Sequence, residues 1–454
     1  MAYRAPSRLF DSATSPRNLT DIYIDHVRKG AARGRDGVVP EVLHREIDRL
    51  SHRLSADARA GTHEFTQYRE LLLSKGAGRT PRVVSIPTAR DRILLKALAA
   101  FLGTVYPASR GVIPQQRIDE VHEALLSTEF DAFVRLDVRD FYPSVRHDSI
   151  RSALAVRIKK QAILDLILRA VETPTVPDGA PRRPVSTIGI PQGLALSNLL
   201  AEAVVASIDH EMTRDHRCVY FRFVDDVLML CQRSDANEIA ETVRDLFADI
   251  GLDVHGLSGG GEKAKIGLII GGFDYLGYCF KGDLVSIRRP SVLKIESALA
   301  RSFTHYKRSR LERVSHALSQ RRCEWYVNLT ITGFIHQKTA RGWLPYFRQM
   351  NDLTLLKQLD ATVQRFMRRF GLPADWKPKT FMRSYWAWRH PNGRHLGYIP
   401  NFDTASVQDK RLVLQDFISV ERVSAMNNLE VSRRFDYEIT KIAKDLERDI
   451  GSIS

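Results

Sequence analysis

Short apolar runs alternate with amphipathic segments up to about residue 290, and beyond that point the pattern is mostly helical. Apolar runs of four to eight residues bounded by turn residues are typical of buried strands, whereas a period near 3.6 indicates a helix. We predict strands at 82–86, 133–138, 251–254, 264–270 and 273–280. We predict helices over 62–72 and 93–105, from 147 onward, within 189–209 and over 235–250.

The segment Tyr220–Cys231, with the sequence YFRFVDDVLMLC, places two adjacent carboxylates between two apolar runs. The pattern predicts a hairpin of two buried strands with Asp225 and Asp226 at the turn. An acidic pair beside apolar strands is unfavourable unless positive charge lies close to it, and a divalent cation would supply that charge. The alternative is a solvated Asp-Asp turn with no ligand.

A third carboxylate, Asp137, ends the apolar run that begins at Phe133 and is followed by Asp140, Phe141 and Tyr142. Phosphoryl transfer to a nucleotide uses two Mg²⁺ ions held about 3.5–4 Å apart by carboxylates on neighbouring strands. Asp137 alone would more often be a helix cap or a surface charge. Together with the later Asp pair, it favours a site for two Mg²⁺ ions, for which Mn²⁺ could substitute.

Composition narrows the class of protein. The 454 residues carry a formal net charge of +15, with 44% hydrophobic and 27% charged residues. Such a basic globular chain suggests a polyanionic partner, most simply nucleic acid, although anionic lipid would also attract it. The four cysteines form no CxxC pair, which argues against a zinc cluster or a disulfide framework. No signal core and no run of about 18 apolar residues occurs, so we expect a cytoplasmic protein without a membrane partner.

Several blocks occur in an order that resembles the reverse transcriptase family, most closely its bacterial retron, group II intron and defence-associated (abortive-infection-type) branch. The resemblance covers roughly residues 30–285. The block that contains FVDD begins with Phe223 where many relatives have Tyr, which removes a hydroxyl group but no metal ligand. The matching blocks are RGRDGV at 33–38, GRTPRVVSIPTARDR at 78–92, LDVRDFYPSV at 136–145, GIPQGLALSN at 189–198, FVDD at 223–226, GGGEKAKIG at 259–267 and FDYLGYCF at 273–280.

This resemblance implies an α+β fold, the right-hand polymerase. Its fingers and palm, with an antiparallel palm sheet and flanking helices, would span residues 1–289. Beyond residue 290 the pattern itself turns mostly helical and basic, from which we expect a basic helical thumb over 290–370 and a helical extension rich in aromatic and basic residues over 371–454.

The resemblance also implies roles for individual residues. Asp137, Asp225 and Asp226 would be the catalytic metal ligands, with Val138 at the same metal site. Lys263 would be the general acid that protonates pyrophosphate, although Lys265 is a rival for that role.

Six residues would contact the incoming nucleotide. Tyr142 lies at the position that blocks a sugar 2′-hydroxyl, which implies a preference for deoxynucleotides, unless the ring merely packs under the sheet. Gln192 would line the nucleotide or simply cap a helix, and the cations would clamp the triphosphate or remain solvated. The six are Tyr142, Phe141, Gln192, Gly193, Arg82 and Lys75.

The C-terminal part offers candidate nucleic-acid contacts. Arg308, Arg310 and Arg313 lie in a basic stretch suited to a duplex backbone. Trp386 and Trp388 alternate with cations in a segment that could stack unpaired bases, although an aromatic core is an equal alternative.

These observations favour an RNA-directed DNA polymerase that uses deoxynucleotides and makes a DNA product. The resemblance implies a bacterial enzyme that works on a dedicated noncoding RNA in antiphage defence. A protein partner or a homo-oligomer is compatible with these observations. Rival hypotheses are a template-free or protein-primed nucleotidyltransferase on the same palm, and an RNA-binding scaffold with a vestigial palm. Metal-dependent incorporation of deoxynucleotide, with and without template, would separate these three.

Overall fold

The computed structural model describes residues 5–30, 32–74, 78, 80–127, 130–257, 264–311, 316–373, 375–391 and 397–447. The chain divides into two compact units: unit 1 is Met1–Ile113 with Phe130–Leu268, and unit 2 is Pro114–Glu129 with Ile269–Ser454. This division at Leu268 precedes the palm boundary at 289 that we expected from the sequence. The separation of a thumb from a C-terminal extension stays a prediction.

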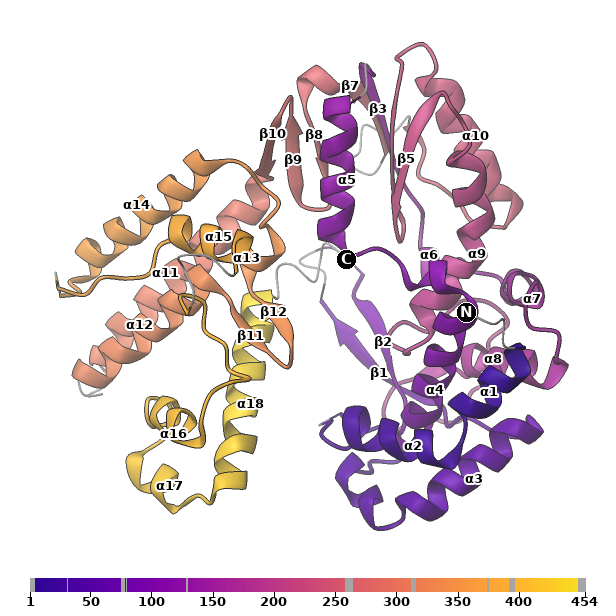
Figure 1. Ribbon diagram of the computed structural model, residues 1–454, viewed down its shortest axis with the longest axis horizontal. Helices are drawn as coiled ribbons and strands as arrows, with labels where there is room; N and C mark the ends of the chain where they lie inside the picture. Colours follow the sequence, from indigo (N-terminus) through magenta and orange to yellow (C-terminus); the bar gives the residue numbers. More distant parts are fainter. Residues whose placement is uncertain are drawn as a thin grey trace. The chain divides into compact units, whose positions relative to one another are not determined.

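An antiparallel sheet of four strands in the order β5-β6-β3-β7 lies at one end of unit 1, at the top of Figure 1. Its central strand alternates strictly: Val134 and Leu136 enter the main hydrophobic core, while Phe133, Arg135 and Asp137 lie on the opposite face. The strands are β3 (Ala132–Asp137), β5 (Cys218–Phe223), β6 (Asp226–Cys231) and β7 (Ala264–Leu268).

Helices α9 (Ser197–Met212) and α10 (Ala236–Asp249) pack against this sheet, and their buried side chains belong to the same core. The strands predicted near 133–138 and 264–270 are confirmed. The strand predicted at 251–254 is wrong: in the described residues of that segment, a single bridge between Val138 and Val254 is all that forms.

The rest of unit 1 contains a second, three-stranded sheet in the order β2-β1-β4 and the remaining helices. They are α1 (Pro6–Ala13), α2 (Pro16–Ile22), η1 (Tyr23–Val27), η2 (Pro40–Arg45), α3 (Ile47–Ala60), α4 (Ala89–Val105), η3 (Pro107–Arg110), α6 (Phe141–Ser144), α7 (His147–Ala155) and α8 (Gln161–Glu172).

The helix predicted over 62–72 is wrong, because this segment leads into strand β1 (Tyr68–Leu73). Pairing decides the outcome: β1 is antiparallel to β2 (Arg82–Ile86) on one side and parallel to β4 (Thr175–Val176) on the other. Local helical periodicity was the only signal available, and tertiary hydrogen bonding overrides it.

Unit 2 combines short hairpins with long helices. The segment 273–280 was predicted as one strand but is a hairpin, because Leu276 and Gly277 both adopt positive φ and reverse the chain. Strands β8 (Phe273–Tyr275), β9 (Tyr278–Lys281) and β10 (Leu284–Ile287) form one sheet, and β11 (Phe334–His336) pairs with β12 (Thr339–Arg341). Its helices are α5 (Pro114–Ser127), η5 (Ile269–Gly271), α11 (Arg289–Leu311), α12 (His316–Thr332), α13 (Trp343–Tyr346), α14 (Leu353–Phe370), α15 (Phe381–Arg389), α16 (Val407–Gln415), α17 (Val420–Ala425) and α18 (Asn428–Glu447).

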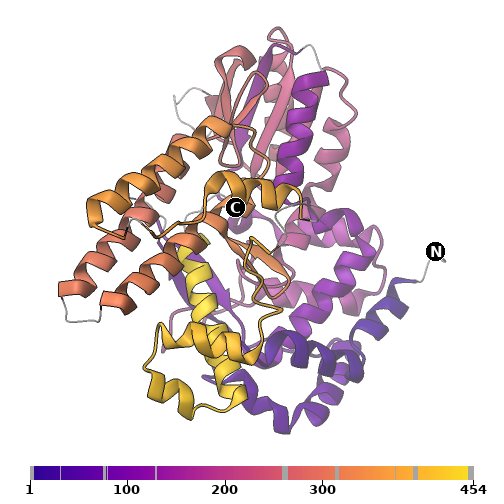
Figure 2. The same cartoon turned by 60° about the vertical axis from the view of Figure 1, so that its left-hand side comes forward.

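The last three helices share a hydrophobic cluster with Leu329 of α12 and Phe334 of β11, which meet Val431 and Phe435 of α18. Figure 2 shows α16 and α17 beside the long α18, in yellow. Among the described residues, no helix combines the length and the apolar character needed to cross a membrane.

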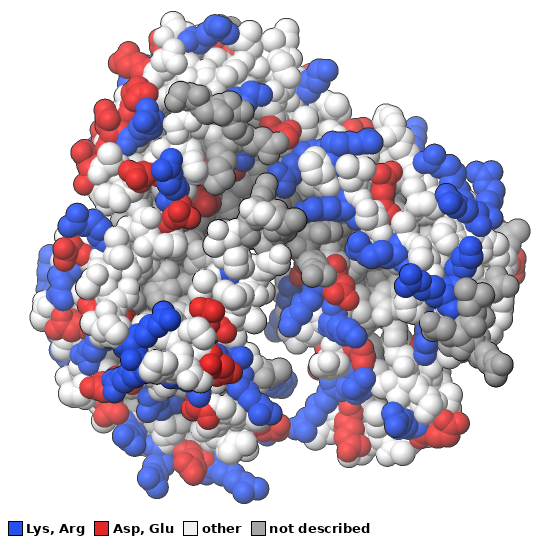
Figure 3. Space-filling model, turned by 180° about the vertical axis from the view of Figure 1, so that it is seen from behind, with Lys and Arg blue, Asp and Glu red and all other residues white. Residues whose placement is uncertain are grey.

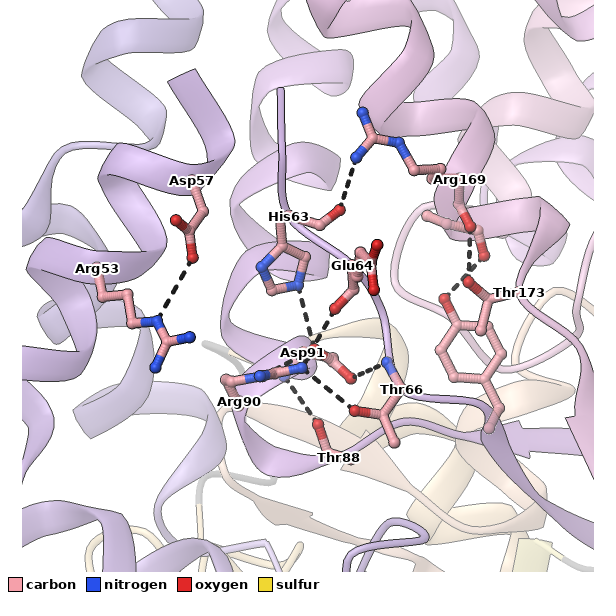
Figure 4. Close-up of polar contacts among 12 residues, drawn as sticks. Arg53, Asp57, His63, Glu64, Thr66, Thr88, Arg90, Asp91, Arg169 and Thr173 are labelled. Carbon is pink, nitrogen blue, oxygen red and sulfur yellow. Dashed lines mark hydrogen bonds and ion pairs between the residues drawn. The ribbon is translucent and has the colours of Figure 1, made fainter. Parts of the chain in front are cut away.

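A buried polar network fixes the loop before β1 to the start of α4 (Figure 4). Asp91 is fully buried, and its carboxylate contacts the His63 ring nitrogen at 3.2 Å and accepts the Thr66 amide at 3.0 Å. Burial by itself raises the pKa of Asp91. The bond to His63, the charge of Arg90 and the Thr88 hydroxyl together lower the pKa by more than burial raises it, so the net shift is downward. The ionised carboxylate therefore stabilises this loop.

We predict that Asp91→Asn lowers the free energy of unfolding at pH 7 by about 3 kcal/mol, because it removes one partner of a buried polar pair. Since the folded pKa is depressed, the stabilising effect is present above the unfolded pKa and disappears as the pH falls through the folded pKa. Denaturant unfolding at pH 7 and at pH 3 measures both effects.

Asp57→Asn is the matched control, because Asp57 pairs with Arg53 at 3.7 Å on the exposed face of α3. It should change stability by less than about 0.5 kcal/mol. Equal losses in the two variants would contradict the structural role assigned to Asp91.

Candidate active site

Strand register brings the three candidate carboxylates together in unit 1. Asp137, at the end of β3, lies directly opposite Asp226, at the start of β6. Asp225 occupies the adjoining turn, and its carbonyl accepts the Val138 amide at 2.9 Å. These four residues, predicted as one metal site, are therefore neighbours in the fold, although their role as ligands stays a prediction.

The hairpin turn itself differs from the sequence prediction by one residue. Phe223 pairs with Asp226, so the two loop residues are Val224 and Asp225 and not the Asp pair. Asp226 belongs to β6, which is why its side chain faces Asp137 across the sheet. Val224 takes a positive φ of 56° at the first loop position.

Two cations lie on the same sheet face as these carboxylates. Arg135 holds both oxygens of Asp226, with Nε–Oδ1 at 2.9 Å and Nη2–Oδ2 at 2.8 Å. Lys265 lies directly opposite Arg135 on β7. Sequence reasoning missed Arg135, although its position two residues before Asp137 on a strand places both side chains on one face.

His255 contacts the third carboxylate. Its Nε2 lies 3.5 Å from Oδ2 of Asp137, and its amide donates to the Asp137 carbonyl at 3.0 Å. The segment at 253–255 therefore continues the edge of the sheet beyond β3 and places an imidazole beside the acidic group. Nothing in the sequence pattern around Gly256 had singled out this histidine.

Asp225 has a shifted pKa. Burial raises it most, the charges of Asp137 and Asp226 raise it further, and a backbone hydrogen bond and the Arg82 guanidinium lower it, giving a pKa of about 6. Mutual repulsion among carboxylates is the physical sign that they lie within electrostatic reach of one another. A bound cation would relieve this repulsion.

The donor set suits a hard divalent cation, because carboxylate oxygens are the ligands that Mg²⁺ prefers. However, within the ranges that the structure describes, no group of three or more His, Cys, Asp or Glu side chains is arranged to hold a metal. A bidentate bond from Arg135 engages both oxygens of Asp226. Asp137, Asp225 and Asp226 are the residues that could hold metal.

Tyr142 lies beside this group, in α6. Its hydroxyl donates to the Asn198 side chain at 3.0 Å, and its ring packs against the main core. Burial, together with the charges of Glu202 and Asp225, raises the pKa of Tyr142 to about 12. The neighbouring Phe141 is buried in the core and faces no solvent. Tyr142 is thus held rigidly, by a partner in Asn198 that the sequence reasoning did not identify.

The Pro-Gln-Gly turn is attached to strand β2. The Gln192 carbonyl accepts the Ser85 amide at 2.7 Å. Gly193 has φ +100°, and a Cβ there would lie 2.8 Å from the Val84 side chain, so only glycine fits. Arg82 begins the same strand. Its charge opposes the upward pKa shifts of both Asp225 and Tyr142, so the guanidinium acts electrostatically on both side chains. Gln192 and Gly193 therefore lie against the strand that Arg82 begins.

Three predicted residues, Lys75, Lys263 and Arg313, lie outside the described residues, as does the side chain of Arg310. In unit 2, Arg308 is exposed on α11, and both predicted tryptophans lie on α15. Whether any of them contacts a ligand stays a prediction.

Comparison with known proteins accounts for the region that holds the acidic group. Residues 74–280 match the family model described as "Reverse transcriptase (RNA-dependent DNA polymerase)". This part of the chain is therefore similar to reverse transcriptase domains. It contains all three carboxylates, the Pro-Gln-Gly turn and Arg82, and it ends before the long helices of unit 2.

The named relatives of this chain are distant. The chain is 25% identical over 218 residues to the "Group II intron-encoded protein LtrA" of Lactococcus lactis subsp. cremoris, covering 45% of this chain and 34% of the relative. It is 25% identical over 183 residues to an "Uncharacterized 91 kDa protein in cob intron" of Schizosaccharomyces pombe, covering 38% of this chain and 22% of the relative. The chain thus spans about a third or less of the length of these relatives.

Solved structures similar to the chain include telomerase from Candida albicans, at a TM-score of 0.44 and 12% identity, covering 86% of this chain and 69% of that one. Telomerase from Candida tropicalis gives a TM-score of 0.36 and 12% identity, covering 51% and 58%.

The raised pKa of Asp225 generates a prediction about metal-free protein. Because the folded pKa is about 6 and the unfolded value is 3.8, ionised Asp225 destabilises the fold as the pH rises through 6. Asp225→Asn should therefore raise the free energy of unfolding at pH 8 in EDTA by about 1–2 kcal/mol, with little effect at pH 4. Thermal melting at both pH values measures this.

Adding Mg²⁺ provides the control. Metal that binds the folded state should raise the melting temperature of the wild type but not of Asp225→Asn. A variant that is less stable than the wild type at pH 8 in EDTA would contradict the repulsion described here.

Proposed function

We propose that this protein is an RNA-directed DNA polymerase that adds deoxynucleotides by two-metal phosphoryl transfer. One observation carries the proposal: Asp137 lies opposite Asp226, with Asp225 in the adjoining turn, inside the segment that matches the reverse transcriptase model. A structural hairpin has no need of three carboxylates whose mutual repulsion destabilises it. A site that binds cations does need several carboxylates close together.

In this proposal Asp137, Asp225 and Asp226 hold two Mg²⁺ ions, which Mn²⁺ could replace. When bound, the ions activate the attacking oxygen and stabilise charge on the phosphoryl group. Arg135 neutralises Asp226 while metal is absent. Arg82, whose charge already acts on Asp225, orients the triphosphate with Gln192, and Tyr142 meets the sugar. Lys263, or its rival Lys265, donates a proton to pyrophosphate.

The function is tested by incorporation of labelled deoxynucleotide on an RNA template with an annealed primer. Asp225→Asn and Asp137→Asn should each reduce incorporation by at least about a thousandfold, because each removes a metal ligand used in the transition state. Asp253→Asn is the matched control: Asp253 lies beside the site and contributes a backbone carbonyl, which accepts the Arg139 amide at 2.7 Å. It should retain activity.

Template dependence separates the rival activities. Incorporation that persists without template favours the nucleotidyltransferase, and a wild type that incorporates nothing while binding RNA favours the scaffold. Full activity in Asp225→Asn would overturn the proposal.

Sugar selection gives a second test of the site. Tyr142→Val should lower the preference for deoxynucleotides over ribonucleotides by roughly tenfold or more, because the proposed block is steric. Tyr142→Phe keeps the ring and loses only the bond to Asn198, so its preference should stay close to that of the wild type. Paired kcat/KM values for dNTP and rNTP measure this ratio, and an unchanged ratio in Tyr142→Val would assign the ring to packing alone.

We also propose that unit 2 contacts nucleic acid through charge. Figure 3 shows Lys and Arg outnumbering Asp and Glu on the side of unit 2 that carries α11, α12 and α14. The sequence prediction had identified Arg308, Arg310 and Arg313 but missed α14. Its exposed face adds Lys357, Arg365, Arg368 and Arg369. An amphipathic helix with a basic face is the signal that could have revealed this second group.

The two predicted tryptophans of α15 have different surroundings. Trp388 is half-buried, and its indole donates to the Thr332 carbonyl at 2.7 Å, at the end of α12. Trp386 is 36% exposed and stacks on His390 at 5.6 Å with an interplanar angle of 29°. We therefore propose that Trp386 stacks an unpaired base, while Trp388 joins two helices.

Trp386→Ala should weaken binding of a single-stranded oligonucleotide by about 1–3 kcal/mol and leave the salt dependence of binding unchanged. Trp388→Ala, the matched variant from the same helix, should instead reduce stability by about 2–4 kcal/mol. Fluorescence anisotropy over a salt series and thermal melting, applied to both proteins, measure the two effects. Equal binding by Trp386→Ala and the wild type would show that Trp386 does not stack on a base of the nucleic acid.

The partner is proposed to be a dedicated noncoding RNA, and the setting bacterial antiphage defence. Both follow from the resemblance to the bacterial branch. Sequencing the RNA and DNA that copurify with the protein tests this: one dominant RNA is expected, and a random sample of cellular RNA would argue against a dedicated template.

A further inference from the structure

The turn that carries Asp225 has an unfavourable backbone conformation. Two-residue hairpin loops require positive φ at their first position, and glycine, asparagine or aspartate usually meets this need. Here the residue is Val224, with φ 56°. A β-branched residue rarely adopts this conformation, and it persists only where surrounding contacts over-determine it. Some contact must therefore hold the turn.

Arg222 supplies that contact. Its Nη1 donates to the Val224 carbonyl at 2.9 Å, two residues along the chain. Because Asp225 follows Val224 directly, this bond fixes the peptide unit from which the Asp225 side chain projects. The Asp225 carbonyl is fixed separately by the Val138 amide, at 2.9 Å.

The guanidinium of Arg222 is itself held by α9. Nε and Nη2 donate to Asp209 at 2.7 and 2.6 Å, and Nη1 and Nη2 donate to Glu202 at 3.2 and 2.6 Å. Tyr220 supports Asp209 with a hydroxyl bond of 3.0 Å. Glu202 and Asp209 are seven residues apart and so share one face of the helix.

This arrangement uses the whole donor set of an arginine. A guanidinium has five N–H donors, of which four go to the two carboxylates and the fifth goes to Val224. Arg222 is only 7% exposed, and hydrogen bonds to Asp209 and the charge of Glu202 raise its pKa well above the usual value despite burial. Lysine, with three donors and no planar fork, cannot reproduce this pattern.

We infer that Arg222 is a positioning residue: clamped by Glu202 and Asp209, it holds the Val224 turn in the conformation that keeps Asp225 beside Asp137. The inference that the turn serves a catalytic site rests on the proposed function, but the inference that Arg222 holds the turn does not. Arg222 itself touches neither Asp137 nor Asp225 through its five bonds, so it acts through the backbone.

Amide hydrogen exchange tests this in protein without metal, template or nucleotide. The informative quantity is the exchange rate of the Val138 amide, which donates to the Asp225 carbonyl, divided by that of the Val134 amide in β3, the strand that Val138 follows. Arg222→Lys should raise this ratio by at least about fivefold, because local opening of the turn frees the Val138 amide. An unchanged ratio would overturn the inference.

Leu230→Ala is the matched control, because Leu230 is fully buried in β6 and lies away from the turn. It destabilises the whole sheet, so its ratio should stay within about twofold of the wild type. An equal rise in both variants would mean that Arg222 contributes only general stability. Glu202→Gln, which weakens one side of the clamp, should give a smaller rise in the same direction if Arg222→Lys fails to fold.

A second variant tests the strain directly. Glycine adopts positive φ without penalty, so in a Val224→Gly background the Arg222→Lys substitution should change the ratio by less than about twofold. The same rise in both backgrounds would overturn the inference.

The functional consequence is measured separately. Arg222→Lys should raise the Mg²⁺ concentration at half-maximal incorporation by about tenfold and lower kcat, with little change in the KM for primer-template. If Arg222→Lys reached half-maximal incorporation at the same Mg²⁺ concentration as the wild type, the result would contradict a positioning role for Arg222. If the wild type incorporates no nucleotide while the exchange results hold, the proposed function fails and the role of Arg222 in the turn stands.

Discussion

Repulsion among three carboxylates is the constraint around which unit 1 is organised. The antiparallel register sets Asp137 against Asp226, and the hairpin adds Asp225. Burial and then the charges of the two neighbouring carboxylates raise the pKa of Asp225 to about 6. Left alone, such a group would push the strand ends apart. Arg135 offsets the charge of Asp226 from the same sheet face, and buried apolar residues behind the sheet keep the strands in register.

The neighbouring elements add rigidity at the points where this group needs it. Arg222 ties the strained turn to α9, and the same helix supplies Asn198, which holds the Tyr142 hydroxyl. The Pro-Gln-Gly turn that precedes α9 is bonded to strand β2. One helix therefore connects the acidic turn, the aromatic side chain and the strand that begins with Arg82, which is the geometry expected of a preorganised site.

The sequence was sufficient to predict elements whose signal is local. Alternation in FVRLDV and YFRFVDD marks two buried strands, and the order of blocks assigns the three aspartates to one place. Prediction from the sequence failed where strand pairing decides the secondary structure. At β1, hydrogen bonding to two partner strands overrides a local pattern with helical periodicity. The loop at Leu276-Gly277 was missed because positive φ at a leucine has no composition signal.

Partners of charged residues were the least predictable feature. Arg135 and Arg222 look like ordinary strand cations in the sequence, and their roles depend on Asp226, Glu202 and Asp209, which lie up to 91 residues away. Likewise, nothing local distinguishes Trp386 from Trp388. The bond from the Trp388 indole to Thr332, 56 residues earlier, assigns one ring to packing and leaves the other exposed.

The central claim is that the three carboxylates form a cation site which Arg135 occupies when metal is absent. Anomalous diffraction from crystals grown with Mn²⁺, primer-template and an unreactive nucleotide tests it most directly. The account predicts manganese peaks between Asp137, Asp225 and Asp226, with the Arg135 guanidinium withdrawn from at least one oxygen of Asp226. Manganese absent from these carboxylates, with the bidentate bond from Arg135 intact, would contradict it.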